Sequence, residues 1–191
     1  MSVKNQGYNI DKYISIFALS QPLKHWHTMT YIDILRNIQE ADLLVSKVLD
    51  GDSISVIGIY THIEKEIRLY GLDAPETRIG RKLREAEEKT RVAGELLRFM
   101  GNQEREFVLR LCPVGTPVTV YTEPGNEKDF WGRQLAYVIL PDGTCLNDLL
   151  IQEGYAKATS EYYCKELARY EIMNWNAKLE KRGLYMLTEI F

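Results

Sequence analysis

The feature that most constrains the fold is a series of five strand-like segments interrupted once by a long helical segment. In the second of these segments, Ile54 and Val56 alternate with Ser53 and Ser55, which is typical of a strand with one buried face. The five segments cover residues 43–49, 53–60, 66–72, 117–121 and 133–140. Between the third and the fourth lies an amphipathic helix over residues 81–101, extended or followed by a second helix at 104–111. This order predicts an α+β fold on a five-stranded β-barrel of the oligonucleotide-binding (OB) type, although other small mixed domains share it.

Residues 1–42 lack this strand pattern and are expected to form a separate extension. Apolar side chains from Tyr31 to Ile38 recur at helical spacing, so the extension should contain one helix. Nothing else in it has an obvious chemical role, and a protein partner is one use for it. The expected organisation is an extension over residues 1–42, a domain over 43–187 with further helices at 146–152 and about 161–181, and a C-terminal tail over 188–191.

The composition favours a globular protein of a reducing compartment. Of the 191 residues, 45% are hydrophobic and 27% charged, which excludes a disordered or fibrous chain. No apolar run approaches the ~18–20 residues of a membrane-spanning helix, so no membrane partner is expected. The cysteines Cys112, Cys145 and Cys164 are odd in number and far apart, which argues against a disulfide framework. We expect an intracellular monomer, with secretion as the alternative because residues 13–19 weakly imitate a leader.

The charge distribution argues against a protein that coats nucleic acid by bulk attraction. The formal net charge is −3, whereas such proteins are basic. Residues 78–110 nevertheless carry nine Lys or Arg against six Asp or Glu. Either this stretch is a solvated helix face or it forms a local site for a phosphate.

The first segment with chemical potential is the Asp50-Gly51-Asp52 turn between the first two strands. Carboxylate oxygens are the preferred ligands of hard cations such as Ca²⁺. The spacing does not follow an EF-hand loop, because the sixth position from Asp50 is Ser55 and the twelfth is Thr61. By itself the segment is as consistent with a simple turn as with a metal site.

The second segment runs from Arg68 to Thr77, where a strand delivers an arginine and ends in an aspartate. A charge at the middle of a buried strand is costly unless it has a partner of opposite charge. Pro75 restrains the residue before it, so the Ala74 carbonyl is a candidate ligand beside Asp73. Glu76 then follows as a candidate base, or as a helix-start residue in the simpler interpretation.

The third segment is Asp129-Phe130-Trp131-Gly132-Arg133. A guanidinium is suited to bidentate phosphate binding, and aromatic rings stack on bases. The simpler interpretation is a hairpin loop with a surface arginine. Taken together, the three segments supply two arginines, two metal-binding carboxylates and one spare glutamate, which is the set needed to cut a phosphodiester.

In these segments the chain resembles the staphylococcal nuclease (thermonuclease) family. The resemblance covers about residues 43–187 and is carried by the strings at 48–53, 68–77, 129–136, 142–147 and 152–156. It implies an OB-fold barrel with three main helices. It also implies calcium-dependent hydrolysis of DNA and RNA, in single-stranded or frayed regions and with little sequence specificity, that leaves 3′-phosphate ends.

The resemblance also implies a role for individual residues. Calcium would be bound by Asp52, Asp73 and the carbonyl of Ala74, with Asp50 supporting the site from behind. Glu76 would be the general base or orient water, and Arg68 and Arg133 would hold the phosphate. Trp131 and Tyr162 would contact the nucleotide.

The chain departs from the family pattern at a few positions. Ala74 replaces a threonine, Ser160 replaces a nucleotide-contacting tyrosine, and the segment between the third and fifth strands is longer. The alternative to a nuclease is a non-catalytic module of the same fold that binds nucleic acid or protein. Members of that kind have typically lost catalytic arginines or carboxylates, which this chain retains.

Overall fold

Five strands close into a β-barrel in the computed structural model, which describes residues 37–191. The order around the barrel is β1-β2-β3-β6-β5, with β3 and β6 parallel and all other neighbours antiparallel. The strands are β1 (Ile38–Asp50), β2 (Ser53–Gly58), β3 (Glu64–Leu69), β5 (Pro117–Thr122) and β6 (Gln134–Ile139). The predicted barrel with helical residues between its third and fourth strands is therefore confirmed.

The long strand β1 closes the barrel because it pairs with two neighbours in turn. Its first residues lie beside β5, with Ile38 opposite Thr122, and its last residues lie beside β2, with Asp50 opposite Ser53. Three register shifts interrupt this pairing, and such irregularities bend a strand and increase its twist. Inward side chains such as Val45, Ile54 and Ile67 are almost fully buried in the core.

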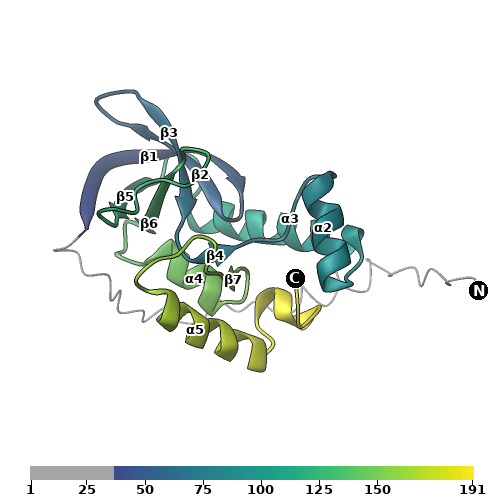
Figure 1. The fold of residues 1–191 in the computed structure, drawn as a ribbon. Coiled ribbons are helices and arrows are strands. Elements are labelled where there is room, and N and C mark those ends of the chain that lie inside the picture. The colour runs from purple at the N-terminus through teal and green to yellow at the C-terminus, as the bar shows by residue number, and fades with distance from the viewer. Residues whose placement is uncertain (1–36) are drawn as a thin grey trace, which may run out of the picture.

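The helices lie beside and below the barrel (Figure 1). A two-stranded sheet of β4 (Leu72–Asp73) and β7 (Lys157–Ala158) connects the barrel to them. Residues 37–191 contain four α-helices where we expected three main ones: α2 (Arg81–Thr90), α3 (Gly94–Leu111), α4 (Leu146–Gln152) and α5 (Leu167–Leu179), followed by the 3₁₀ helix η2 (Gly183–Met186).

The additional helix arises because the segment predicted as one helix over 81–101 is broken after Thr90. Arg91 has a left-handed conformation with φ of 61°. The Thr90 hydroxyl donates to the Ala86 carbonyl at 2.7 Å and accepts from the Val92 N–H at 3.2 Å. Side chains of this type compete with the helix for backbone groups. Helical periodicity continues across the break, which is why the sequence pattern did not reveal it.

The strand β1 begins at Ile38, five residues before the expected domain boundary at Leu43. The expected helix over Tyr31–Ile38 is therefore wrong at its last residue, while residues 31–36 lie outside the described part. Glu40 explains why the strand extends so far, because it pairs with Lys65 of β3 and accepts a hydrogen bond from Gln134 of β6 at 2.6 Å. Burial opposes ionisation of Glu40, but these partners outweigh it and lower its pKa.

At the other end, α5 begins at Leu167 rather than near residue 161 and stops at Leu179. Residues 188–191, expected as a tail, end in Phe191, which is 6% exposed and packs on Tyr185 at a ring distance of 5.0 Å.

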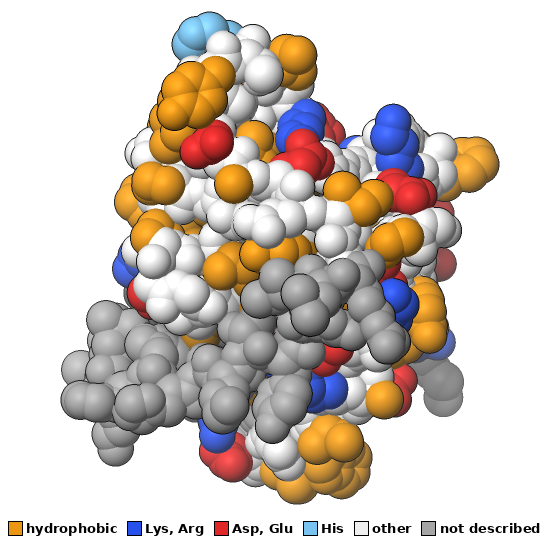
Figure 2. Space-filling view, turned by 90° about the vertical axis from the view of Figure 1, so that its left-hand side faces the viewer, with side chains coloured by type: hydrophobic (Ala, Val, Ile, Leu, Met, Phe, Trp, Pro, Cys, Tyr) orange, Lys and Arg blue, Asp and Glu red, His pale blue; other side chains and the backbone are white. Residues whose placement is uncertain are grey.

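Within residues 37–191 no helix is both long and apolar enough to cross a membrane. On the face drawn in Figure 2, basic, acidic and hydrophobic side chains of the described residues are intermixed, without a continuous basic surface.

The structure predicts that the domain needs residues 38–40. A chain that starts at Asn37 keeps the pairing of β1 with β5 and the contacts of Glu40, whereas a chain that starts at Ala41 loses the contacts of Glu40 and the part of the pairing made by residues 38–40. We expect the shorter chain to melt about 3–10 °C below the longer one, as for a loss of about 1–3 kcal/mol. Thermal denaturation of the two chains in the same buffer measures this, and equal midpoints would place the boundary at Leu43 instead.

Candidate active site

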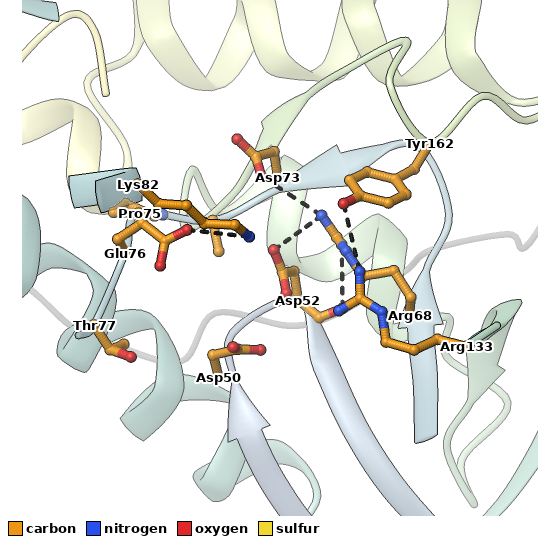
Figure 3. A pocket seen from close by; sticks show the side chains of 11 residues that line it. Asp50, Asp52, Arg68, Asp73, Pro75, Glu76, Thr77, Lys82, Arg133 and Tyr162 are labelled. Atoms are coloured by element: carbon orange, nitrogen blue, oxygen red, sulfur yellow. Dashed lines mark hydrogen bonds and ion pairs between the residues drawn. The ribbon is translucent and has the colours of Figure 1, made fainter. Parts of the chain in front are cut away.

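The three motif segments meet in one cleft at the edge of the barrel (Figure 3). The β1–β2 turn contributes the two aspartates, the end of β3 contributes Arg68, and the chain after β4 contributes Glu76. The loop before β6 supplies Arg133. The cleft encloses about 410 Å³ including its open mouth, and its lining includes Asp50, Asp52, Arg68, Asp73, Ala74, Glu76, Arg133 and Tyr162.

Arg68 lies at the centre of this cleft and is 1% exposed. One terminal nitrogen, Nη2, lies 2.9 Å from Oδ2 of Asp52 and 3.5 Å from Oδ1 of Asp73. The other, Nη1, donates to the carbonyls of Asp52 at 3.2 Å and Leu69 at 3.3 Å. The mid-strand charge predicted to be costly therefore has two carboxylate partners, and it joins both expected cation ligands.

Tyr162 joins the two arginines of the site. Its ring covers the Arg68 guanidinium, with 3.8 Å between the guanidinium carbon and the ring centroid, in the geometry of a cation–π contact. Its hydroxyl lies 3.4 Å from Nη2 of Arg133. Tyr162 is only 7% exposed, so its predicted contact with a nucleotide can involve only the exposed edge of the residue.

Arg133 is fixed by Asp129 at its backbone N–H and Nε, while its terminal nitrogens have weaker contacts. Its Nε lies 2.7 Å from Oδ2 of Asp129, whose other oxygen accepts the Arg133 N–H at 2.9 Å. Burial would lower the pKa of Arg133, but the hydrogen bond and charge of Asp129 raise it overall. The terminal nitrogens make only long contacts, at 3.4 Å to Ser53 and Tyr162. They are therefore available to an incoming anion.

Two lysines neutralise carboxylates of the cleft. Nζ of Lys82, in the first turn of α2, lies 3.6 Å from Oε1 of Glu76. Nζ of Lys157, opposite Asp73 in the β4–β7 pair, lies 3.2 Å from Oδ2 of Asp73 and donates to the carbonyl of Phe191 at 2.6 Å. The side chains of Lys82 and Glu76 are 67% and 33% exposed, and surface pairs of this kind are weak, so Lys82 can leave Glu76 and pair with a phosphate.

Exposed aromatic rings stand beside the cleft. Trp131 is 63% exposed and Phe130 94%, and the two rings meet edge to face at 5.7 Å. The Lys82 ammonium lies 5.9 Å from the Trp131 ring and the Arg133 guanidinium 5.6 Å. The tip of the loop therefore presents a stacking surface next to positive charge.

Two carboxyl groups, one in the turn itself and one on α3, are partly or wholly buried. Oδ1 of Asp50 is buried without a hydrogen-bond partner, as are both side-chain oxygens of Glu104 from α3. Burial, followed by the negative charge of Asp52, raises the pKa of Asp50 to about 7. Burial, followed by the charges of Asp52, Asp73 and Asp50, raises the pKa of Glu104 well above its usual range.

The arrangement fits a hard cation such as calcium. The groups nearest the expected position are the oxygens of Asp52, Asp73 and the Ala74 loop, and oxygen ligands are those that Ca²⁺ prefers. Buried carboxyl oxygens without partners, as on Asp50, are what a cation or its water would satisfy. Within residues 37–191 no three His, Cys, Asp or Glu side chains are arranged to hold a metal. The Ala74 carbonyl and water molecules would therefore have to provide the cation ligands that Asp52 and Asp73 do not.

The structure brings the predicted site residues together and adds three that the motifs did not indicate. Asp50, Asp52, Arg68, Asp73 and Glu76 share the cleft, together with Ala74, Arg133 and Tyr162, and Trp131 stands beside it. The additions are Lys82, Lys157 and Glu104. For Glu104 a signal existed: it falls at helical spacing with the buried Leu97, Met100 and Val108, where an apolar residue is expected.

The raised pKa of Asp50 has a measurable consequence for the metal-free protein. Between about pH 4, where the unfolded carboxyl titrates, and about pH 7 the native state keeps a proton that the unfolded state has lost. The stability should therefore fall as the pH rises through this window. Asp50→Asn has no carboxyl group that titrates. In chelator, its melting temperature minus that of wild type should therefore increase as the pH rises from about 5 to 7.5.

Thermal denaturation across this pH range measures the difference, with Glu106→Gln, an exposed position of α3, as the control that should run parallel to wild type. A constant difference between Asp50→Asn and wild type would show that Asp50 is ionised throughout.

The chain is similar in sequence to known proteins. A family described as staphylococcal nuclease homologue matches residues 66–186. The chain is 34% identical over 118 residues to Endonuclease YhcR of Bacillus subtilis (strain 168), which covers 61% of this chain but only 9% of that protein. It is 26% identical over 141 residues to an uncharacterized endonuclease of Escherichia coli O157:H7, covering 74% of each chain. The family match spans more than half of the sequence, and the chain belongs to the family of staphylococcal nuclease homologues.

Proposed function

We propose that the protein is a calcium-dependent nuclease that hydrolyses phosphodiester bonds of DNA and RNA with little sequence specificity and leaves 3′-phosphate ends. The observation that carries the proposal is the cleft itself, where two arginines, two candidate cation ligands and a separate glutamate line one small space. The family membership and the relatives named endonucleases support the class of reaction.

The cation would be held by Asp52, Asp73 and the carbonyl of Ala74. When bound, it would neutralise a phosphate oxygen and take over the carboxylate charge that Arg68 balances now. Asp52 and Asp73 both contact Nη2 of Arg68, which holds the two carboxylates close together before any cation arrives. Preorganised charges of this kind need little rearrangement during the reaction.

The two arginines would hold the phosphate in different ways. Arg133 has the more accessible guanidinium, with a side chain 24% exposed, and its Nε is occupied by Asp129. That contact therefore orients the terminal nitrogens, which can bind the phosphate as negative charge develops on it in the transition state. Arg68, with a side chain 2% exposed, contributes mainly a fixed positive charge beneath the phosphate.

Glu76 would orient or deprotonate the attacking water. Its side chain is 33% exposed, so water reaches it. The Pro75–Glu76 backbone packs directly on α3 at Gly101, where an added Cβ would lie 2.4 Å from the Pro75 carbonyl oxygen. This close contact holds Glu76 at the cleft, where the exposed Lys82 is the ion-pair partner of its carboxylate.

The surroundings of the cleft favour a flexible single strand as substrate. A second hollow of about 960 Å³ adjoins the first and is lined by Glu76, Lys82 and Arg133 with Arg78 and Arg81. Together with the exposed Trp131, it offers backbone contacts and a stacking surface without reading a base edge. Because such contacts are common to all sequences, little sequence specificity is expected.

The alternative is a module of the same fold that binds nucleic acid or protein without cutting. It would keep the arginines and aromatic rings but would not need Glu76 near the phosphate. Substitutions of Glu76 and Arg133 therefore distinguish the two functions.

We expect Glu76→Gln to bind a single-stranded oligonucleotide about as tightly as wild type but to cut it roughly 10²–10⁴ times more slowly, because the amide cannot accept a proton. Single-turnover cleavage together with fluorescence anisotropy measures both quantities. Glu88→Gln, an exposed position on α2, is the matched control and should cut at the wild-type rate. If Glu76→Gln also cuts at that rate, Glu76 is not the base.

Arg133→Ala should lower the cleavage rate by about 10²–10³ and weaken oligonucleotide binding far less, if Arg133 contacts the phosphate mainly in the transition state. The same two assays apply, with circular dichroism to establish that the variant is folded. Equal losses in rate and in affinity would instead indicate an ordinary binding contact and would favour the binding module.

A further inference from the structure

Glu104 is a buried acidic residue that neither the fold nor the proposed reaction explains. It lies on α3, is 0% exposed, and neither of its side-chain oxygens has a hydrogen-bond partner. Leu97, Met100 and Val108 of the same helix face are apolar and buried. A carboxyl group in such a place costs free energy unless something positive or hydrogen-bonding meets it.

The side chain of Glu104 is directed at the turn that carries the expected cation ligands. A Cβ added at Gly51 would lie 1.9 Å from its Cδ and 2.3 Å from its Oε2, so the carboxyl group rests on the Gly51 backbone. Asp50 and Asp52 flank Gly51 in sequence. One turn earlier on α3, Gly101 contacts the Pro75–Glu76 backbone in the same way. One face of α3 therefore packs against the backbone of two segments that carry expected site residues.

When fully ionised, the carboxyl groups around Gly51 carry more negative charge than the basic groups that pair with them. Asp50, Asp52 and Asp73 each act electrostatically on Glu104. Their positive partners are Arg68 and Lys157. With all four carboxyl groups ionised, two negative charges remain uncompensated, which is the charge of one divalent cation.

Direct ligation by Glu104 does not fit the geometry. The Gly51 backbone lies against its carboxyl group, and no three acidic, histidine or cysteine side chains of the described residues are arranged to hold one metal. A water molecule bound to the cation can bridge the cation and the Glu104 carboxylate. Groups that act on a metal through its ligands typically change its affinity by 10–100-fold.

We propose that Glu104 is an outer carboxylate of the cation site, which accepts a hydrogen bond from a water bound to the calcium ion and strengthens its binding. The proposal rests on the calcium dependence of the proposed function and assigns to α3 a part in it. It also accounts for Gly51, because any larger residue there would push Glu104 away from the turn.

The test is calcium binding by the full chain, measured by isothermal titration of calcium chloride into chelator-treated protein without nucleic acid. We expect Glu104→Gln, which keeps the shape but not the charge, to bind calcium about 10–100 times more weakly than wild type. Glu106→Gln lies two residues away on the same helix but is exposed, and it should bind as wild type does. Asp52→Asn, a direct ligand, should lose more affinity than Glu104→Gln.

A second substitution guards against a folding defect. Glu104→Met replaces the carboxyl group by an apolar side chain of similar size, so in chelator the protein should be at least as stable as wild type. We expect it to lose calcium affinity as Glu104→Gln does. A purely structural role for Glu104 would change the melting temperature in chelator and leave the dissociation constant unchanged.

The outcomes separate the two proposals. If wild type binds calcium and both Glu104 variants bind it equally well, Glu104 has no part in the cation site and the proposed function stands. If wild type binds no calcium, the calcium dependence is wrong and the role of Glu104 falls with it. Weaker binding by both variants, with Glu106→Gln unchanged, supports the inference.

Discussion

The interaction on which the site depends is the contact of the buried Arg68 with Asp52 and Asp73. Arg68 lies opposite Ser53 of β2 and Leu135 of β6 in the barrel, so its backbone is fixed by both neighbouring strands. Burying a guanidinium there is favourable only with strong partners, and the two carboxylates together with the Tyr162 ring provide them. Removing either side would leave an uncompensated buried charge, so the barrel and the site stabilise each other.

This dependence explains how an acidic chain can act on a polyanion. The basic groups are few, but two have fixed positions, Arg68 on its two aspartates and Arg133 on Asp129, while the more exposed Lys82 lies beside Glu76. A cation at Asp52 and Asp73 would add further positive charge at the same place. The positive charge of the proposed phosphate site is therefore concentrated in the cleft and not spread over a basic surface.

Much of this could be predicted from the sequence, because the informative residues are local. The turn at Gly51 follows from neighbouring residues, and the barrel follows from the order of the strands. The strand expected over 66–72 is instead divided at Gly71, so that Arg68 lies in β3 and Asp73 in β4. The break at Arg91 was not visible, because a hydroxyl of Thr90 ends a helix whose periodicity continues. Lys157 and Glu104 were missed because each reaches the site through tertiary packing, across the β4–β7 pair and beneath Gly51.

Cleavage of a 5′-labelled single-stranded oligonucleotide by the purified full chain tests the central claim most directly. With calcium we expect a ladder of products that stops on addition of chelator, and product ends that a polymerase extends only after phosphatase treatment, because they carry a 3′-phosphate. Tight binding of the oligonucleotide with no calcium-dependent cleavage would contradict the claim and identify the protein as a binding module. Products that are extended without phosphatase would contradict the assigned chemistry of the cut.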